Sequence, residues 1–125
     1  MRILNLTQHK STNDQQKDHV YDLRGARLEQ LKDLLTFDEI PTEYVLWDRA
    51  DKIAALAEQE GAKSAMIGGA PYFMPWLERA LLRRVINIKY AFSKRESQDV
   101  HLEDGTVRKR QVFRHIGFVE KLANY

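Results

Sequence analysis

The sequence predicts a single α/β domain, in which a mostly parallel sheet is flanked by helices and followed by a C-terminal antiparallel β-hairpin. Short apolar or alternating segments are separated by segments of helical periodicity, which is the order of an α/β protein. Asp104-Gly105 lies between two alternating segments, a pattern typical of a tight hairpin turn. The length of 125 residues fits one domain, so residues 1–125 are taken as one unit.

The N-terminal part predicts a strand, a short helix and a second strand. Residues 3–7 alternate apolar and polar side chains, as half-buried strands do. Thr12 followed by Gln15 has the spacing of a capping box, so we expect a short helix that runs to about His19. Residues 20–23 are rich in strand-forming side chains and predict the second strand.

Two helices, a buried strand and a further helix are expected next. Leucines at positions 28, 31, 34 and 35 have helical spacing. Pro41 is suited to begin a second helix, and Gly61 is suited to end it. Residues 64–67 predict a short apolar strand, after which Ala70-Pro71 opens another helix.

The C-terminal part predicts three strands. Residues 86–92 are mostly apolar and are bounded by Ser93-Lys94-Arg95. Residues 100–103 and 106–113 alternate on either side of Asp104-Gly105. We therefore expect these last two segments to form a hairpin that adds antiparallel strands to the sheet.

Composition excludes several classes of protein. Hydrophobic residues make up 43% and charged residues 30%, which is too apolar for a disordered chain and too charged for a membrane protein. Cysteine is absent, so disulfides, Cys-ligated metals and thiol nucleophiles are excluded. No segment approaches the roughly 20 apolar residues of a membrane span, and the first residues lack the pattern of a signal peptide. A cytoplasmic protein without a membrane partner is expected.

The charges are unevenly distributed along the chain. The net charge is only +2, but residues 13–60 are rich in Asp and Glu, whereas residues 79–115 concentrate Arg and Lys. A basic C-terminal half favours an anionic partner such as a phosphate, a nucleotide or RNA. An ordinary solvated surface explains the same charges, and the charge count alone does not separate the two interpretations.

Three polar clusters each follow a predicted strand. They are Thr7-Gln8-His9, Gly68-Gly69-Ala70 and Ser93-Lys94-Arg95. Ligands of open α/β sheets bind beyond the carboxyl ends of the strands, so we expect the three clusters to converge at one edge. The glycines allow a ligand to approach the backbone, and the helix that follows offers free N–H groups to a phosphate. A tight turn explains the glycines equally well.

The side chains of these clusters suit a phosphate group. Lys94 supplies a point charge and Arg95 a bidentate fork, while the Ser93 hydroxyl is able to orient a phosphate oxygen. His9 is able to give or take a proton near neutral pH. A lone histidine is more often an ordinary surface residue, and a basic strand end is often simply solvated.

A second histidine lies near the C-terminus, where Arg114-His115 stands between two phenylalanines. An aromatic side chain here is able to stack on a base, although a place in the core is the simpler interpretation. Because His9 and His115 are far apart in sequence, only the fold can unite them. The spacing of His, Asp and Glu predicts no metal site. Neither G-x-G-x-x-G nor a Walker loop is present, which disfavours dinucleotide cofactors and ATP hydrolysis.

Several motifs, in this order, resemble those of a known family. They are His9 with Thr12 and Gln15, Gly68-Gly69, the segment 90–96, and the hairpin that leads to Phe-Arg-His-Ile-Gly-Phe at 113–118. The chain in this respect resembles small CRISPR-associated proteins of type III systems. These are single-domain relatives of the CARF fold, and several are regarded as ring nucleases. The resemblance covers most of the chain, with departures at Lys10-Ser11 and Phe92.

The resemblance implies a Rossmann-like, CARF-like homodimer that binds cyclic oligoadenylate of unspecified ring size and cleaves it without metal or other cofactor. The ribose 2′-OH would attack the neighbouring phosphate and leave a 2′,3′-cyclic phosphate. The implied catalytic residues are Ser93, Lys94, Arg95 and His9. The implied ligand-binding residues are Thr7, Gln8, Thr12, Gly68, Gly69, Ala70, Arg114 and His115. Duplex DNA is not an expected partner.

Two other functions fit the same residues. One is a non-catalytic module that holds a cyclic oligonucleotide or RNA, and the other is a phage-encoded interaction protein whose basic half docks on an acidic surface. Cleavage of a labelled ring in EDTA separates the enzyme from the module. Salt-sensitive binding of generic RNA, without preference for cyclic adenylates, favours the interaction protein.

Overall fold

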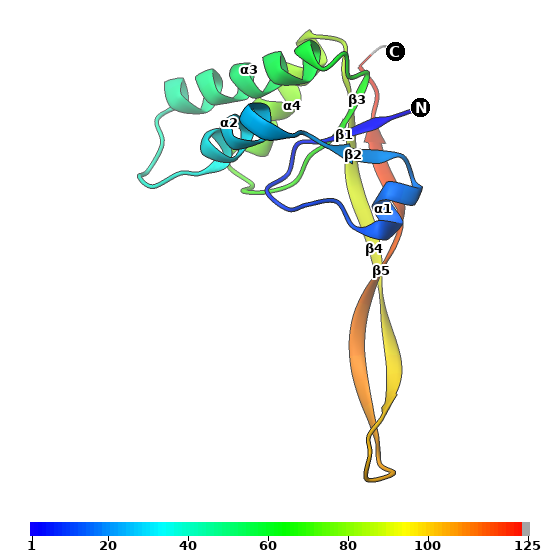
Figure 1. Cartoon of the computed structure of the whole chain (residues 1–125). Coiled ribbons are helices and arrows are strands. Elements are labelled where there is room, and N and C mark those ends of the chain that lie inside the picture. Colours follow the sequence, from blue (N-terminus) through cyan, green and yellow to red (C-terminus); the bar gives the residue numbers. More distant parts are fainter. Residues whose placement is uncertain (124–125) are drawn as a thin grey trace.

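The structure, a computed structural model, describes residues 1–123 and contains one five-stranded sheet in the order β2-β1-β3-β4-β5. The strands are β1 (Ile3–Asn5), β2 (Val20–Asp22), β3 (Ser64–Met66), β4 (Asn87–His101) and β5 (Val107–Lys121). The helices are α1 (Asn13–Lys17), α2 (Gly25–Leu35), α3 (Glu43–Gln59) and α4 (Met74–Arg83). The predicted α/β class, with a mostly parallel sheet and a C-terminal antiparallel hairpin, is confirmed (Figure 1).

The strand order reverses at β1. This strand pairs in parallel with β2 on one side and with β3 on the other, and β3 pairs in parallel with β4. After β1, the chain therefore adds β2 on one side of that strand and then β3, β4 and β5 on the other side. In open α/β sheets, such a reversal leaves a crevice beyond the carboxyl ends of the two strands where it occurs. In this chain those strands are β1 and β3.

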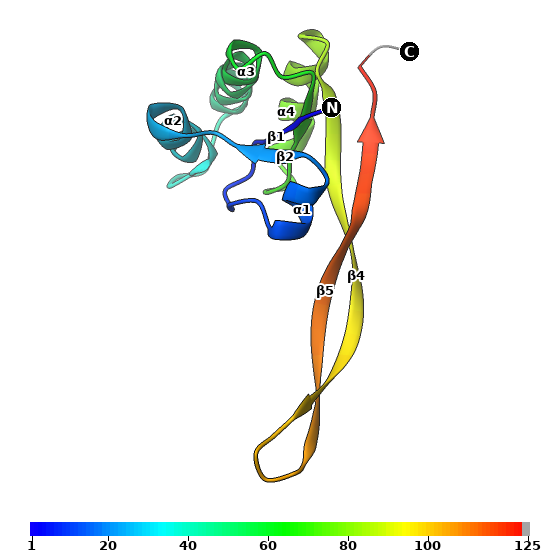
Figure 2. The same cartoon turned by 45° about the vertical axis from the view of Figure 1, so that its right-hand side comes forward.

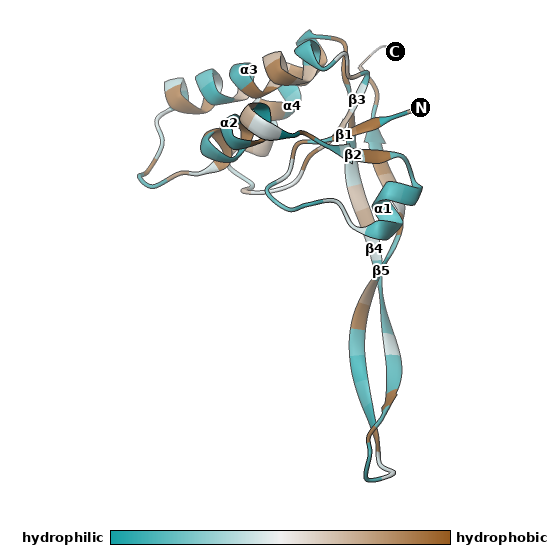
Figure 3. Cartoon of the chain, viewed as in Figure 1, coloured by the Kyte–Doolittle hydropathy of each residue, from teal (hydrophilic) through white to brown (hydrophobic). Residues whose placement is uncertain are grey.

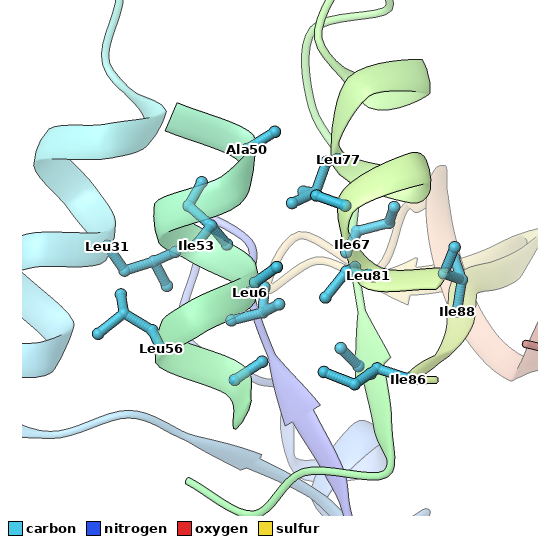
Figure 4. Packing of buried hydrophobic residues seen from close by; sticks show 14 of the residues in the cluster. Leu6, Leu31, Ala50, Ile53, Leu56, Ile67, Leu77, Leu81, Ile86 and Ile88 are labelled. Atoms are coloured by element: carbon cyan, nitrogen blue, oxygen red, sulfur yellow. The ribbon is translucent and has the colours of Figure 1, made fainter. Parts of the chain in front are cut away.

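The main core lies between the sheet and the helices α2, α3 and α4. Helix α3 buries residues at helical spacing, including Ala50, Ile53 and Ala57. Ala50 and Ile53 are labelled in Figure 4. The buried α3 residues pack in one cluster with Leu77 and Leu81 of α4, with Ile88 of β4, and with Leu6 and Ile67, which directly follow β1 and β3. Each fully buried Leu or Ile side chain contributes about 1.5–3 kcal/mol to folding, so this layer fixes the strands that carry the crevice.

The opposite face of the sheet holds a smaller cluster. Ile3, Val20 and Met66 are buried there, and Phe118 of β5 packs against them. Ile3 and Leu4 belong to different clusters because successive residues of a strand point to opposite faces. Helix α1 lies on the side of the small cluster, since its C-cap residue Asp18 contacts His115 of β5.

The two long strands β4 and β5 extend far beyond the rest of the sheet. They pair from Ile88 with Lys121 as far as His101 with Val107. Their outer part, residues 93–114, projects from the body as a twisted two-stranded ribbon, which we call the arm (Figures 1 and 2). Most of the arm is hydrophilic, with a few apolar positions (Figure 3). The predicted strand end at residue 92 is therefore wrong, because antiparallel pairing continues the strand through the polar residues that follow.

Local sequence signals locate most element ends. The predicted capping box joins Thr12 and Gln15 at the start of α1, and α3 ends next to Gly61, which has φ +73°. The turn at Asp104-Gly105 is also confirmed, with φ +85° at the glycine. The predicted helix start at Ala70-Pro71 is wrong. Residues 71–73 form a turn, and α4 begins at Met74.

Candidate ligand-binding crevice

A crevice of about 680 Å³ lies beyond the carboxyl ends of β1 and β3, where the strand order reverses. This volume is typical of small-ligand sites, which span about 300–1,000 Å³. Two of the three predicted polar clusters meet in it. The predicted site residues that line the crevice are Thr7, Gln8, His9, Thr12, Gly68, Gly69 and Ala70.

The loop after β1 is held by Asn5, a buried polar residue of that strand. The Asn5 amide nitrogen donates to the carbonyl oxygen of His9 at 2.7 Å and to the Asp22 carboxylate at 2.8 Å. Its Oδ1 accepts hydrogen bonds from the backbone N–H and from the hydroxyl of Thr7. Asp22 also accepts from the backbone and the hydroxyl of Ser11. One buried side chain thus sets the course of residues 7–11 along the crevice.

Several predicted ligand contacts are already engaged within the protein. The Thr7 hydroxyl donates to Asn5, and the Gln8 amide donates to the carbonyl oxygen of Leu35 at 3.1 Å. The Thr12 hydroxyl accepts from the backbone N–H of Gln15. These side chains shape the wall of the crevice, while the exposed side chains of His9 and Lys10 remain available to a ligand.

The opposite wall presents backbone N–H groups. Within residues 1–123, no hydrogen bond has the amide of Gly68, Gly69 or Ala70 as its donor. Gly69 has φ +152°, a conformation that residues with a Cβ rarely adopt. Successive free amides in a turn form a concave site for anions. The segment 68–70 is therefore built like a phosphate cradle.

Aromatic side chains complete the crevice wall. Phe37 packs edge-on against Tyr72 and Phe73, with ring centroids 5.7 and 5.2 Å apart. Tyr72 is about half exposed, so its ring is accessible from the crevice. Exposed rings of this kind are able to stack on nucleobases.

Tyr90 of β4 lines the same crevice and donates a hydrogen bond to Glu78 of α4. Burial, and then this bond to a carboxylate, raise the pKa of Tyr90 above its ordinary value. Burial by itself would raise the pKa of Glu78, but hydrogen bonds from Tyr90 and Lys121 outweigh it and leave that pKa lowered. The hydrogen bond therefore links Tyr90, in the crevice wall, to Glu78 of α4, with Tyr90 as a protonated phenol and Glu78 as a carboxylate.

The electrostatics of the crevice favour an anion. Among residues 1–123, Lys10 brings positive charge to its wall, and no Asp or Glu lines it. A larger hollow of about 1,000 Å³ lies across the β1 loop and shares residues 7–10. It includes two carboxylates, Asp22 and Glu60, that are bonded within the protein. The larger hollow also holds three further cations, Arg2, Arg24 and Lys32. We place the candidate site in the smaller crevice because that crevice contains the unbonded amides of residues 68–70 and, within the described residues, is lined by no Asp or Glu.

The third predicted cluster lies outside the crevice. Ser93, Lys94 and Arg95 are in the middle of β4, where they pair with His115, Arg114 and Phe113 respectively. Ala91 lines the crevice, so these residues begin about 7 Å further along the strand. Successive residues of a strand point to opposite sides, so Ser93 and Lys94 do not face one phosphate together. All three clusters were expected to converge at one edge of the sheet. Two of them meet in the crevice, and Ser93-Lys94-Arg95 does not.

Arg114 and His115 also lie on β5 rather than in the crevice. Arg114 forms an ion pair with Glu96 across the arm, at 3.2 Å. The His115 side chain is 7% exposed, and its Nε2 lies 2.8 Å from the Asp18 carboxylate. Its ring packs edge-on against Phe118. The structure places His115 in the packing between α1 and β5, so it does not join His9.

Sequence reasoning missed several residues of the crevice. Phe37 and Thr36 come from the connection after α2, where no motif marks them. Tyr72 and Tyr90 also line the crevice, although neither was among the predicted site residues. Asn5 could have been identified from the sequence. It stands between apolar residues 3, 4 and 6, where a polar side chain is expected to be buried and to need hydrogen-bond partners.

The described residues contain neither a metal-binding group of side chains nor a membrane-spanning helix. Within residues 1–123, no group of three or more His, Asp or Glu side chains is arranged to hold a metal ion. In the same part of the chain, no helix has the length and apolarity needed to cross a membrane.

The structure is thus an α/β domain with a crevice at the strand reversal, and no Asp or Glu of the described residues lines that crevice. The chain belongs to the family described as the Uncharacterized protein MJ1673 family, which it matches over residues 1–119. No curated protein and no solved structure gives a significant match. The family match covers all four helices, the whole arm and every strand except the last two residues of β5.

Proposed function

We propose that this protein is a Rossmann-like domain that binds cyclic oligoadenylate in the crevice between β1 and β3 and cleaves it without a metal ion. One observation carries the binding proposal. Residues 68–70, whose amides donate no hydrogen bond within residues 1–123, lie in the wall of a crevice that no carboxylate lines among the described residues. That arrangement suits a phosphodiester, and the Tyr72 ring beside it suits an adenine. The choice of a cyclic oligoadenylate rests on the resemblance of the sequence motifs.

The cleavage step needs few groups. The ribose 2′-oxygen attacks the adjacent phosphorus, the bond from phosphorus to the 5′-oxygen breaks, and the products are a 2′,3′-cyclic phosphate and a 5′-hydroxyl. One proton leaves the 2′-OH and one reaches the 5′-oxygen, so no water is consumed. His9 is the proposed acid–base group, and Lys10 with the amides of residues 68–70 is proposed to stabilise the phosphate charge.

Binding is tested by titrating labelled cyclic tetra-adenylate into the protein in EDTA. Lys10→Ala removes the one lysine of the crevice wall and is expected to weaken binding about tenfold. Lys17→Ala is the matched control, since Lys17 is an exposed lysine of α1 that does not line the crevice. Equal binding by both variants and the parent would contradict the assignment of the crevice.

Cleavage is tested separately with His9→Asn, which keeps a polar side chain but cannot transfer a proton at neutral pH. The variant is expected to bind the ring like the parent and to lose about 10²–10⁴-fold in turnover. If the parent holds the ring but forms no product in EDTA, the protein is a binding module rather than an enzyme. If it binds neither cyclic nor linear adenylates, the proposed function is wrong.

A further inference from the structure

The arm of residues 93–114 has little support from its own chain. None of its residues is buried, and an isolated two-stranded ribbon is only marginally stable in water. Of the thirteen large exposed apolar side chains among the described residues, six lie on β4, β5 and their turn. Phe113 in the arm is 69% exposed, and Ile116 lies beside the arm base. A concentration of this kind marks a protein–protein contact.

The arm also carries cations without acidic partners. Within the described residues, Lys94, Arg95, Arg108 and Arg110 take part in no ion pair. Arg108 and Arg110 are two residues apart on β5, so both point to the same side of the ribbon, about 7 Å apart. We call these four cations the basic strip, and an acidic and partly apolar surface would complement it.

Such a surface exists at the connection between α2 and α3. Asp38, Glu39 and Glu43 are exposed and take part in no ion pair within residues 1–123. Ile40 between them is 97% exposed, and Tyr44 is also largely exposed. We call these five residues the corner patch. Its unpaired acids and exposed apolar side chains are complementary to the unpaired cations and exposed apolar side chains of the arm.

The arm and the corner patch flank the same crevice. β4 runs parallel to β1 and β3, so the arm leaves the sheet at the edge where the crevice opens, just after Ala91. Thr36 and Phe37 line the crevice, and the corner patch begins at the next residue. In Figure 1 the connection from α2 to α3 lies at the far end of the helical layer from the arm. The arm of one molecule thus leaves its own patch uncovered.

We propose that the arm of one copy of this chain docks on the corner patch of a second copy, with the reciprocal contact closing a two-fold dimer. A contact between two different patches closes a dimer when a two-fold axis relates the copies, so that each arm meets the patch of the other copy. The arm comprises 22 residues, within the roughly 20–30 per side of a standard interface. From Ser93 to His101 it reaches about 27 Å, enough to pass along a second body. The two crevices then open toward the interface between the copies.

A nucleic acid is the rival partner for the basic strip. It would use the cations of the arm and could stack a base on Phe113, but it would leave Ile40 and the three acids of the corner patch without a role. The second copy accounts for both surfaces and both charges, so the observations favour it. The dimer proposal is tested by measuring the mass of the protein without any nucleotide. Its failure can therefore be distinguished from a failure of the proposed function.

The test is sedimentation of the full chain at micromolar concentration. The parent is expected to be a dimer. Asp38→Lys with Glu39→Lys, or Arg108→Glu with Arg110→Glu, should each raise the dimer Kd at least about tenfold. Combining all four substitutions restores opposite charges and should recover most of the affinity. Lys63→Glu, an exposed charge reversal between α3 and β3, is the control that should leave the dimer intact.

Several outcomes would overturn the proposal. The first is a parent protein that stays monomeric at about 100 μM. The second is a charge-reversal variant whose dimer Kd equals that of the parent. The third is a combined variant whose dimer Kd stays as high as that of either charge-reversal variant. Arm-dependent binding of single-stranded RNA by a monomer would establish the rival instead. Melting curves confirm that each variant is folded. If a reversal variant unfolds, Phe113→Ser replaces it, and an unchanged dimer in that variant also contradicts the proposal.

Discussion

Gly69 shows at the scale of one residue how the backbone shapes the crevice. Its φ of +152° is strained for any residue with a Cβ, whereas a Cβ at Gly68 would meet Thr7 Cγ2 at an ordinary 3.8 Å. Gly69→Ala is therefore expected to lower the free energy of unfolding by about 1–3 kcal/mol. Gly68→Ala should lower it by less than about 1 kcal/mol. Urea denaturation measures both, and equal losses would refute the assigned backbone strain.

Tyr90 predicts a pH effect. Its pKa is raised in the folded state by burial and by the hydrogen bond to Glu78, so the folded protein holds this proton more tightly than the unfolded chain. The resulting stabilisation is fully present below the ordinary pKa of 10 and is lost as the pH rises above that value. The difference in unfolding free energy between the parent and Tyr90→Phe should therefore shrink between about pH 9 and 12.

The control for this measurement is Tyr44→Phe, which alters an exposed tyrosine far from Glu78. At neutral pH, Tyr90→Phe should cost about 1 kcal/mol through the lost hydrogen bond, and Tyr44→Phe should cost little. A difference for Tyr90→Phe that stays constant up to pH 12 would show that the hydrogen bond to Glu78 does not favour the protonated phenol.

At the scale of elements, two helices end in the same way with different residues. After α3, Ala62 N–H donates to the Ala57 carbonyl oxygen and Gly61 N–H to that of Glu58. After α4, Ile86 and Val85 make the equivalent bonds to Leu81 and Leu82. Both are Schellman motifs, which place one residue in the left-handed region. That residue is Gly61 in the first and Val85, with φ +58°, in the second.

Val85→Gly is accordingly expected to stabilise the protein. The left-handed conformation costs an L-residue about 1–2 kcal/mol that glycine avoids, and Val85 is largely exposed, so little packing is lost. The unfolding free energy should rise by about 1 kcal/mol. Arg83→Gly, inside the last turn of α4, is the control and should lower it by a similar amount. A loss of stability in Val85→Gly would contradict this description of the helix end.

At the scale of the whole molecule, the arm is separable from the core. Every buried residue in the described chain lies at or before Lys89. Ser93 pairs with His115, so replacing residues 94–114 by Asn-Gly joins two paired residues through a tight turn. The shortened monomer should unfold cooperatively with a free energy within about 1 kcal/mol of the parent monomer. A molten or unfolded product would mean that the arm helps to form the core.

Much of the fold could be predicted because its signals are local. The capping box at Thr12, the stop at Gly61 and the turn at Asp104-Gly105 depend on backbone conformations within a few residues. The length of β4 could not be predicted in this way. Residues 93–99 are polar and resemble a loop, and they become a strand only because β5 pairs with them.

Local patterns in the chain were sufficient for the order of the elements, the sheet type and the two loops that wall the crevice, because periodicity, caps and glycines act over short distances. Strand pairing, which joins residues up to dozens of positions apart, settled the remainder. It carried Ser93-Lys94-Arg95 out along the arm, packed His115 against Asp18, and brought Phe37 and Tyr90 beside the amides of residues 68–70. Such long-range contacts depend on the packing of the whole chain, which no single segment encodes.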